Sequence, residues 1–116
     1  MSQVNFDNLI SDHPEHERAL RLIQSWLNRH HRTTSIYLDD LIVEVPVDSA
    51  ELADTLSLLV QEHVLRRFYK VLTPDGVYAD RKFNSPTEIP EKLADRFEHY
   101  FDTDESDIVP VFEMVA

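Results

Sequence analysis

The chain has 116 residues, of which 42% are hydrophobic and 28% are charged, a composition ordinary for one small soluble domain. It contains no cysteine and a single glycine, which excludes disulfides, cysteine-based metal centres, thiol chemistry and the glycine-rich phosphate loops of nucleotide-binding folds. The formal net charge of −11 opposes binding to nucleic acid or anionic lipid and favours a basic protein partner. Because the sequence has neither a long apolar run nor a signal peptide, we expect a cytoplasmic protein.

The charge is unevenly distributed along the chain. Residues 1–37 are neutral, and residues 38–63 hold seven acids and no base. Residues 64–83 hold five bases against two acids, and residues 84–116 hold nine acids against two bases. The sequence therefore predicts a mildly basic patch between two acidic regions.

A first helix is predicted over residues 14–31. Asp12 followed by Glu15, with Pro14 between them, is typical of a helix start. Helical spacing places the apolar side chains on one buried face, which comprises Ala19, Leu20, Ile23, Trp26, Leu27 and His30.

Two further helices follow closely. A short one over 38–45 has its N-cap within residues 33–35 and is stopped by Pro46. The third is predicted over 49–62, because Asp48 and Glu51 repeat the capping pattern. Its predicted core face comprises Leu52, Ala53, Leu56, Leu59 and Val60.

From Val64 onward the residues favour strands. Residues 64–72 are rich in residues that favour strands, and residues 73–76 have the Pro and Gly of a tight turn. Residues 77–83 are predicted to run back as a second strand. The pattern predicts a hairpin with partly basic strands.

This order resembles that of a winged helix-turn-helix domain over about residues 12–83. The resemblance is carried by the sequence Pro-Val-Asp-Ser-Ala-Glu-Leu at 46–52, which enters the third helix, and by Arg-Phe-Tyr-Lys-Val at 67–71. It implies an α+β fold with a three-helix core and a β-hairpin wing. In that family the third helix usually reads DNA.

Residues 84–116 are predicted to extend this core within one domain, 1–116. Residues 84–90 form a linker, residues 90–101 a C-terminal helix, and residues 108–115 a short extended segment. This segment is expected to pack on the core or pair at a sheet edge, because Pro110 cannot donate in a central strand. We expect Trp26, Leu56 and Phe97 to be buried together.

The tail holds more large apolar groups than a completed winged helix can cover. Some of them should therefore lie at an interface with a partner or a second copy. We take Tyr100, Phe101 and Phe112 as the candidate interaction residues there. The tail also resembles those of small winged-helix modules in bacterial multi-protein systems.

Two histidine pairs, His13 with His16 and His30 with His31, have spacings from which a metal site could be drawn. Their places at the ends and on the apolar face of a helix favour structural roles instead. We therefore expect no metal at these histidines.

An acidic loop partly matches a calcium-binding pattern. Asp102, Asp104, Ser106 and Glu113 match positions 1, 3, 5 and 12, but Asp107 stands where the loop needs glycine. We predict a solvated turn, with no metal and no cofactor.

No catalytic motif stands out. Asp39 and Asp40 are adjacent on a helix and point apart, and no nucleophile turn singles out any serine. So small a domain has little room for a cleft of about 300 Å³. We therefore expect no enzyme activity.

The third helix is unsuited to DNA, because residues 48–62 hold four acids and no base. The wing residues could solvate the hairpin, dock an acidic partner or touch nucleic acid, and they comprise Arg66, Arg67, Tyr69, Lys70, Arg81 and Lys82. The sequence favours a non-catalytic protein-interaction module, an adaptor or regulator that binds a protein partner or forms a homodimer. The alternatives are a DNA-binding transcriptional regulator that uses its basic wing, and an acidic DNA-mimic inhibitor.

Overall fold

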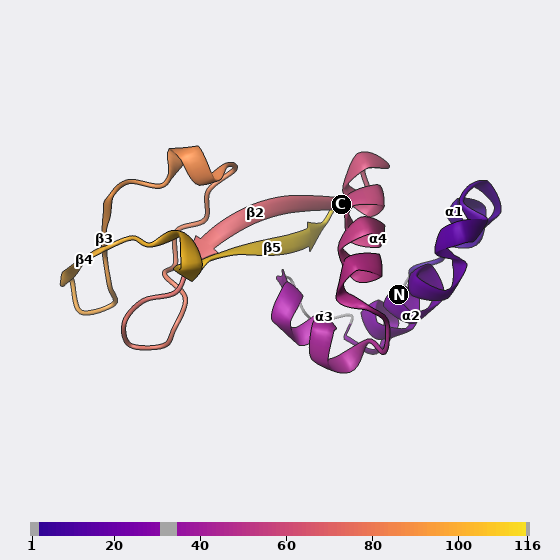
Figure 1. Cartoon of the computed structure of the whole chain (residues 1–116), viewed down its shortest axis with the longest axis horizontal. Helices are drawn as coiled ribbons and strands as arrows, with labels where there is room; N and C mark the ends of the chain where they lie inside the picture. Colours follow the sequence, from indigo (N-terminus) through magenta and orange to yellow (C-terminus); the bar gives the residue numbers. More distant parts are fainter. Residues whose placement is uncertain (1–2, 31–34, 116) are drawn as a thin grey trace.

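Helices gather at one end of the molecule and short strands at the other (Figure 1). The computed structural model describes residues 3–30 and 35–115, which span 48 × 29 × 24 Å. The helices are α1 (Asp7–Asp12), α2 (Glu17–Arg29), α3 (Leu38–Glu44) and α4 (Ser49–Gln61). The strands are β1 (Ile36–Tyr37), β2 (Leu65–Val71), β3 (Lys92–Ala94), β4 (Tyr100–Asp102) and β5 (Ile108–Met114). No helix of the described ranges is long and apolar enough to cross a membrane.

Helix α2 buries the predicted apolar face but starts later than predicted. A 3₁₀ turn at Pro14–His16 precedes it, and Asp12 ends the unpredicted helix α1 rather than capping α2. The capping prediction for Asp12 is therefore wrong.

Helices α3 and α4 lie where the sequence places them. Helix α3 ends before Pro46, and its N-cap residue is Tyr37, so the cap expected within residues 33–35 is not at Ser35. Thr33 and Thr34 lie outside the described residues. Asp48 occupies the N-cap position of α4, although its side chain makes no capping hydrogen bond. The buried face of α4 is rotated from the predicted one, because Ala53 is exposed and Val60 only half-buried, and it comprises Leu52, Thr55, Leu56, Leu58 and Leu59.

The partner predicted for β2 is wrong. Strand β2 pairs antiparallel with β5 along its whole length, and β1 pairs with the other edge of β5, giving the order β1-β5-β2. Residues 77–83 pair antiparallel with the segment 64–72 only at two isolated bridges, Tyr69 of β2 with Phe83 and, just past the end of β2, Leu72 with Tyr78. The apolar segment of β5 suits a central strand, whereas residues 77–83 carry three consecutive charged side chains.

Pro110 lies in this central strand, contrary to the expectation of an edge. Its register partner Tyr69 exchanges both backbone hydrogen bonds with Phe83 instead, at 2.8 and 2.9 Å, so β2 requires no donor from Pro110. On the other side, β1 ends at the pair of Tyr37 with Val111. The missing N–H of Pro110 therefore breaks no ladder bond.

Residues 90–101 form no helix. Strands β3 and β4 pair there as a hairpin, with Leu93 opposite Phe101. Leu93 packs with Val71 and Phe83 in a small second cluster, whereas Phe97 is on the surface. The prediction that Trp26, Leu56 and Phe97 are buried together is therefore wrong for Phe97, because only Trp26 and Leu56 lie in the main core.

The chain is thus a mixed α and β structure with small antiparallel sheets. We call residues 72–107 the arm, and the described remainder, with the four helices and β1, β2 and β5, the base. The arm leaves the base at the ends of β2 and β5 (Figure 1).

Candidate functional site

The outward surface of α3 and α4 carries acidic, small polar and apolar side chains. Helix α3 exposes Asp39, Asp40, Ile42, Val43 and Glu44. Helix α4 exposes Ser49, Ala50, Ala53, Asp54, Ser57 and Gln61. No Lys or Arg lies in either helix. We call these residues the α3–α4 surface.

A small groove of about 190 Å³ lies between α4 and the sheet, with Ala53, Tyr69 and Pro110 in its lining. Arg67 also lines it and donates to Ser57 Oγ at 3.1 Å. Its guanidinium lies 5.6 Å from the centroid of the Phe112 ring. This predicted wing cation is therefore half-buried and held against α4.

The other predicted wing residues do not form one patch with Arg67. Side chains alternate along β2, so Arg66 and Lys70 lie on the sheet face opposite Arg67 and Tyr69. Lys82 Nζ lies 2.7 Å from Glu113 Oε2 and 4.3 Å from the Phe68 ring centroid. Arg81 lies 4.7 Å from the Phe83 ring centroid.

The three predicted C-terminal contact residues are also separated. Tyr100 is exposed on β4, and Phe101 is half-buried in the small cluster of the arm. Phe112 is only 3% exposed within the main core, so it offers no surface to a partner.

Phe97 is the exposed aromatic side chain that the sequence analysis placed in the core. It follows Asp95 by two residues, and an Asp side chain can accept the backbone N–H two residues on, which competes with helix formation. This local pattern was the signal that could have placed Phe97 in a turn.

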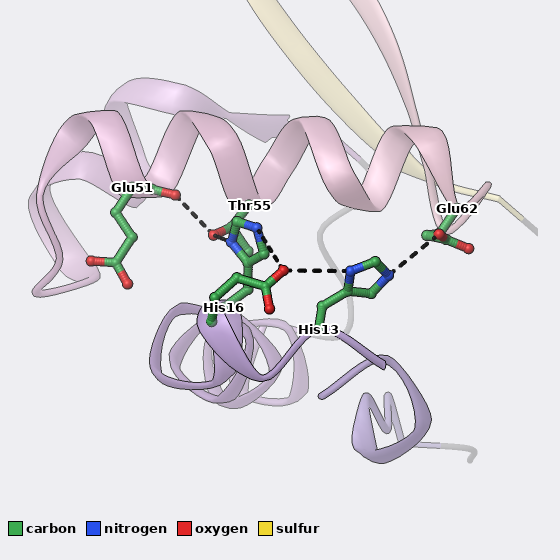
Figure 2. Close-up of polar contacts among 6 residues, drawn as sticks. His13, His16, Glu51, Thr55 and Glu62 are labelled. Carbon is green, nitrogen blue, oxygen red and sulfur yellow. Dashed lines mark hydrogen bonds and ion pairs between the residues drawn. The ribbon is translucent and has the colours of Figure 1, made fainter. Parts of the chain in front are cut away.

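His13 and His16 connect the 3₁₀ turn to α4 (Figure 2). His13 Nε2 lies 3.6 Å from Glu62 Oε1, and His16 Nδ1 lies 3.1 Å from the hydroxyl of Thr55. That hydroxyl donates to the carbonyl of Glu51 at 2.8 Å, so its oxygen accepts from His16. Among the described residues, no group of three or more His, Asp or Glu side chains is placed to hold a metal ion. The contacts therefore pack two elements together.

His30 completes the packing at the end of α2. Its ring stacks on Trp26 with centroids 4.2 Å apart, and its Nδ1 lies 2.9 Å from the Trp26 carbonyl oxygen. His31 lies outside the described residues.

The acidic loop is a capped turn. Asp104 Oδ1 accepts from both the backbone N–H and the hydroxyl of Ser106, each at 2.9 Å. Both hydrogen bonds lower the pKa of Asp104, and the bond from the backbone N–H has the larger effect. Glu113, which matched the last calcium position, pairs with Lys82.

A larger cleft of about 610 Å³ lies beside the N-terminal segment, with Phe6, Leu27 and Val64 in its lining. The expectation that the chain has little room for a cleft is therefore wrong. The titratable side chains in this lining, Glu62 and His30, contact His13 and Trp26. Within the described ranges, no hydrogen bond or ion pair joins Glu62 to His30.

Comparisons with protein-family models, curated proteins and solved structures give no match to this chain. The function of the chain is therefore inferred from the surfaces described above.

Proposed function

We propose that this chain is a non-catalytic protein-interaction module, an adaptor or regulator, on a winged-helix scaffold. The chain order α2, β1, α3, α4, β2, β5 and the sheet order β1-β5-β2 support the scaffold. In this proposal the arm stands where a winged helix has the loop of its hairpin.

The observation that carries the function is the charge of the α3–α4 surface. A DNA-reading helix places Arg, Lys, Asn or Gln against bases and phosphates. Here α4 presents Asp54, small side chains and, in its last turn, a single Gln at Gln61, and α3 adds Asp39 and Asp40. These carboxylates repel phosphate, whereas Ile42 and Val43 beside them suit an apolar protein contact.

The wing does not supply the missing positive charge. Arg67 is held by Ser57 and Phe112, and Lys82 by Glu113. Arg66 and Lys70 remain on the face that points away from α4, and Arg81 remains exposed in the arm. Three cations release few counterions and give weak, non-specific affinity for DNA.

Fluorescence anisotropy with a labelled DNA duplex tests the exclusion of DNA. At about 150 mM salt we expect dissociation constants no tighter than about 10 μM, in the non-specific range. The control variant Asp54→Lys with Ser57→Lys puts two cations on α4 and should bind more tightly, with a steeper salt dependence. Sub-micromolar binding by the unaltered chain would overturn the proposal in favour of a DNA-binding regulator.

Affinity capture from the native host with the whole chain as bait tests the positive part. We expect a protein to co-purify in stoichiometric amount after nuclease treatment. Capture that disappears with nuclease would indicate nucleic acid as the ligand instead.

A further inference from the structure

The β3–β4 hairpin forms the outermost part of the arm (Figure 1). Phe97 and Tyr100 lie there with exposed fractions of 57% and 76%, the highest of any Phe, Tyr or Trp side chain in the described ranges. We call residues 94–100 the arm tip. Large aromatic side chains exposed on a protruding hairpin are typical anchors of protein interfaces.

The arm tip is organised by its own hydrogen bonds. Asp95 Oδ1 accepts from the backbone N–H of Phe97 at 2.8 Å and from that of His99 at 2.9 Å. The Asp95 N–H donates to the His99 carbonyl at 2.8 Å, and Glu98 adopts a left-handed φ of 63° to close the turn. The loop that presents Phe97 is therefore ordered before any partner binds, which lowers the entropy cost of binding.

Contacts with the rest of the arm fix this loop in place. Arg96 lies with its guanidinium 4.8 Å from the Phe97 ring centroid and its Nε 3.6 Å from Asp75 Oδ2. On the inner side of the hairpin, Leu93 and Phe101 pack into the small cluster of the arm. The exposed aromatic rings thus stand on a hairpin anchored to two other segments.

The charge around the arm tip is negative. Residues 84–107 hold eight acids and two bases, Lys92 and Arg96. Lys92 Nζ lies 3.1 Å from Asp102 Oδ1, and Arg96 pairs with Asp75, so both bases face carboxylates. Glu91 and Glu98 are exposed nearby. This field attracts cations and repels phosphate and anionic lipid.

We infer that the arm tip docks a basic partner protein, with Phe97 and Tyr100 entering an apolar pocket bordered by Lys or Arg side chains. A second copy of this chain is a poorer occupant, because each copy carries a net charge of −11. The inference rests on the proposed function and adds both the docking site and the chemistry of the partner.

Nuclear magnetic resonance of the isotope-labelled full chain tests the docking site with three synthetic peptides of equal length. One alternates Lys and Arg with Leu, the second has Ser in place of Leu, and the third has Glu in place of Lys and Arg. We expect the first peptide to shift the amides of residues 94–100. The second should bind at least about tenfold more weakly, since hot-spot anchoring needs apolar contact, and the third should not bind.

Single substitutions test whether the exposed aromatic side chains of the arm tip bind the first peptide. Phe97→Ala should weaken binding of the first peptide at least about tenfold, whereas Met114→Ala, which removes a 40% exposed apolar side chain at the end of β5 away from the arm, should leave it unchanged within about twofold. Asp95→Ala keeps both rings but releases the loop, and should weaken binding by an intermediate factor. Thermal unfolding of each variant verifies that the chain still folds.

Four results would overturn the inference. They are shifts confined to the α3–α4 surface, equal affinity for the Leu and Ser peptides, no shift with any peptide at millimolar concentration, and binding of lipid vesicles that depends on Phe97. A sedimenting mass that falls on Phe97→Ala would assign the site to a second copy and overturn it too. All of these leave the exclusion of DNA untouched, whereas tight duplex binding would overturn the proposed function itself.

Discussion

Fifteen buried side chains meet in one cluster of the base; they come from four helices and three strands, with Phe6 and Val45 beside helix ends. The second cluster is much smaller and joins Phe83 and Leu93 of the arm to Val71 of β2. The base can therefore derive most of its stability from apolar burial, and the arm much less. The arm is attached to the base at its ends by β2 and β5, by the stacking of Tyr78 on Tyr37 and by the backbone bonds of Phe83 with Tyr69, and internally by local polar bonds. This difference separates a region that specifies the fold from a region that presents surface.

The polar bonds of the arm lie mostly between near neighbours in the sequence. Ser85 and Asp104 each accept from a backbone N–H two residues on, and Asp95 accepts from those two and four residues on. Thr73 donates to the Val77 carbonyl, and Thr103 to that of Pro90. Each bond contributes about 1 kcal/mol at most near water, so the arm is stable only while the base holds its ends.

Ending the chain after Phe83 should have the largest effect. It removes β5, the central strand, with the buried Val111 and Phe112. We expect no cooperative thermal unfolding and an expanded form by light scattering. A well-behaved folded monomer would show that the base does not depend on β5.

A matched deletion spares β5 and removes the arm. Leu72 N–H donates to the Asp107 carbonyl at 2.8 Å, so the ends of the arm lie side by side. Replacing residues 73–106 by Asn-Gly should close a two-residue hairpin there. We expect cooperative unfolding to persist, with a loss of about 1.5–3 kcal/mol because Val71 becomes exposed. Failure of this variant to fold would mean that the arm stabilises the base, contrary to the comparison.

Leucine truncations in the two clusters sharpen the same contrast. Leu56→Ala in the main core should lower the free energy of unfolding by about 2–5 kcal/mol in chemical denaturation. Leu93→Ala in the arm should mainly accelerate amide hydrogen exchange at Phe101 and Leu72, with little change in the base. Equal acceleration throughout the chain would indicate one cooperative unit.

The same contrast explains what the sequence could predict. Helices α2 and α4 have long amphipathic patterns and flanking Pro or Asp, so their places follow from local spacing. The partner of β2 could not be predicted from local spacing. A nearby turn at 73–76 suggested a local hairpin, whereas the strand that pairs with β2 begins at Ile108. Pairing between distant segments depends on the whole core and leaves no local signal.

In the arm the local pattern itself was misleading. Leu93, Phe97, Tyr100 and Phe101 have helical spacing, yet the side chain of Asp95 closes a turn between two strands. For the candidate site, the sequence analysis singled out Tyr100 but placed Phe97 in the core, and the six wing residues that it grouped do not form one patch. The faces of Arg66 and Arg67 could not be assigned either, because strand register against β5 decides them.

The pH dependence of the arm tip should show the effect of Asp95. The backbone hydrogen bond from His99, and a second from Phe97, lower the pKa of Asp95 from 3.8. A lowered pKa means that the ionised form stabilises the loop above pH 3.8, and that this contribution is lost as the pH falls through the lowered value. The carboxyl carbon shift of Asp95 should therefore change only at strongly acidic pH, and the amide shifts of Phe97 and His99 should show a step there that Asp95→Asn abolishes. Absence of that acidic step, or its persistence in Asp95→Asn, would contradict this account.

Surface ion pairs should give the smallest effect, and one that differs between the regions. Lys92 and Asp102 are 67% and 83% exposed, so a double-mutant cycle with Ala should yield a coupling of about 0.2–1 kcal/mol that salt weakens further. Lys82 and Glu113 are closer together, less exposed, and join the arm to the base against the Phe68 ring. Their coupling should therefore exceed that of Lys92 with Asp102 and survive added salt better, because burial limits screening. The reverse order would mean that the arm is not attached to the base through this pair.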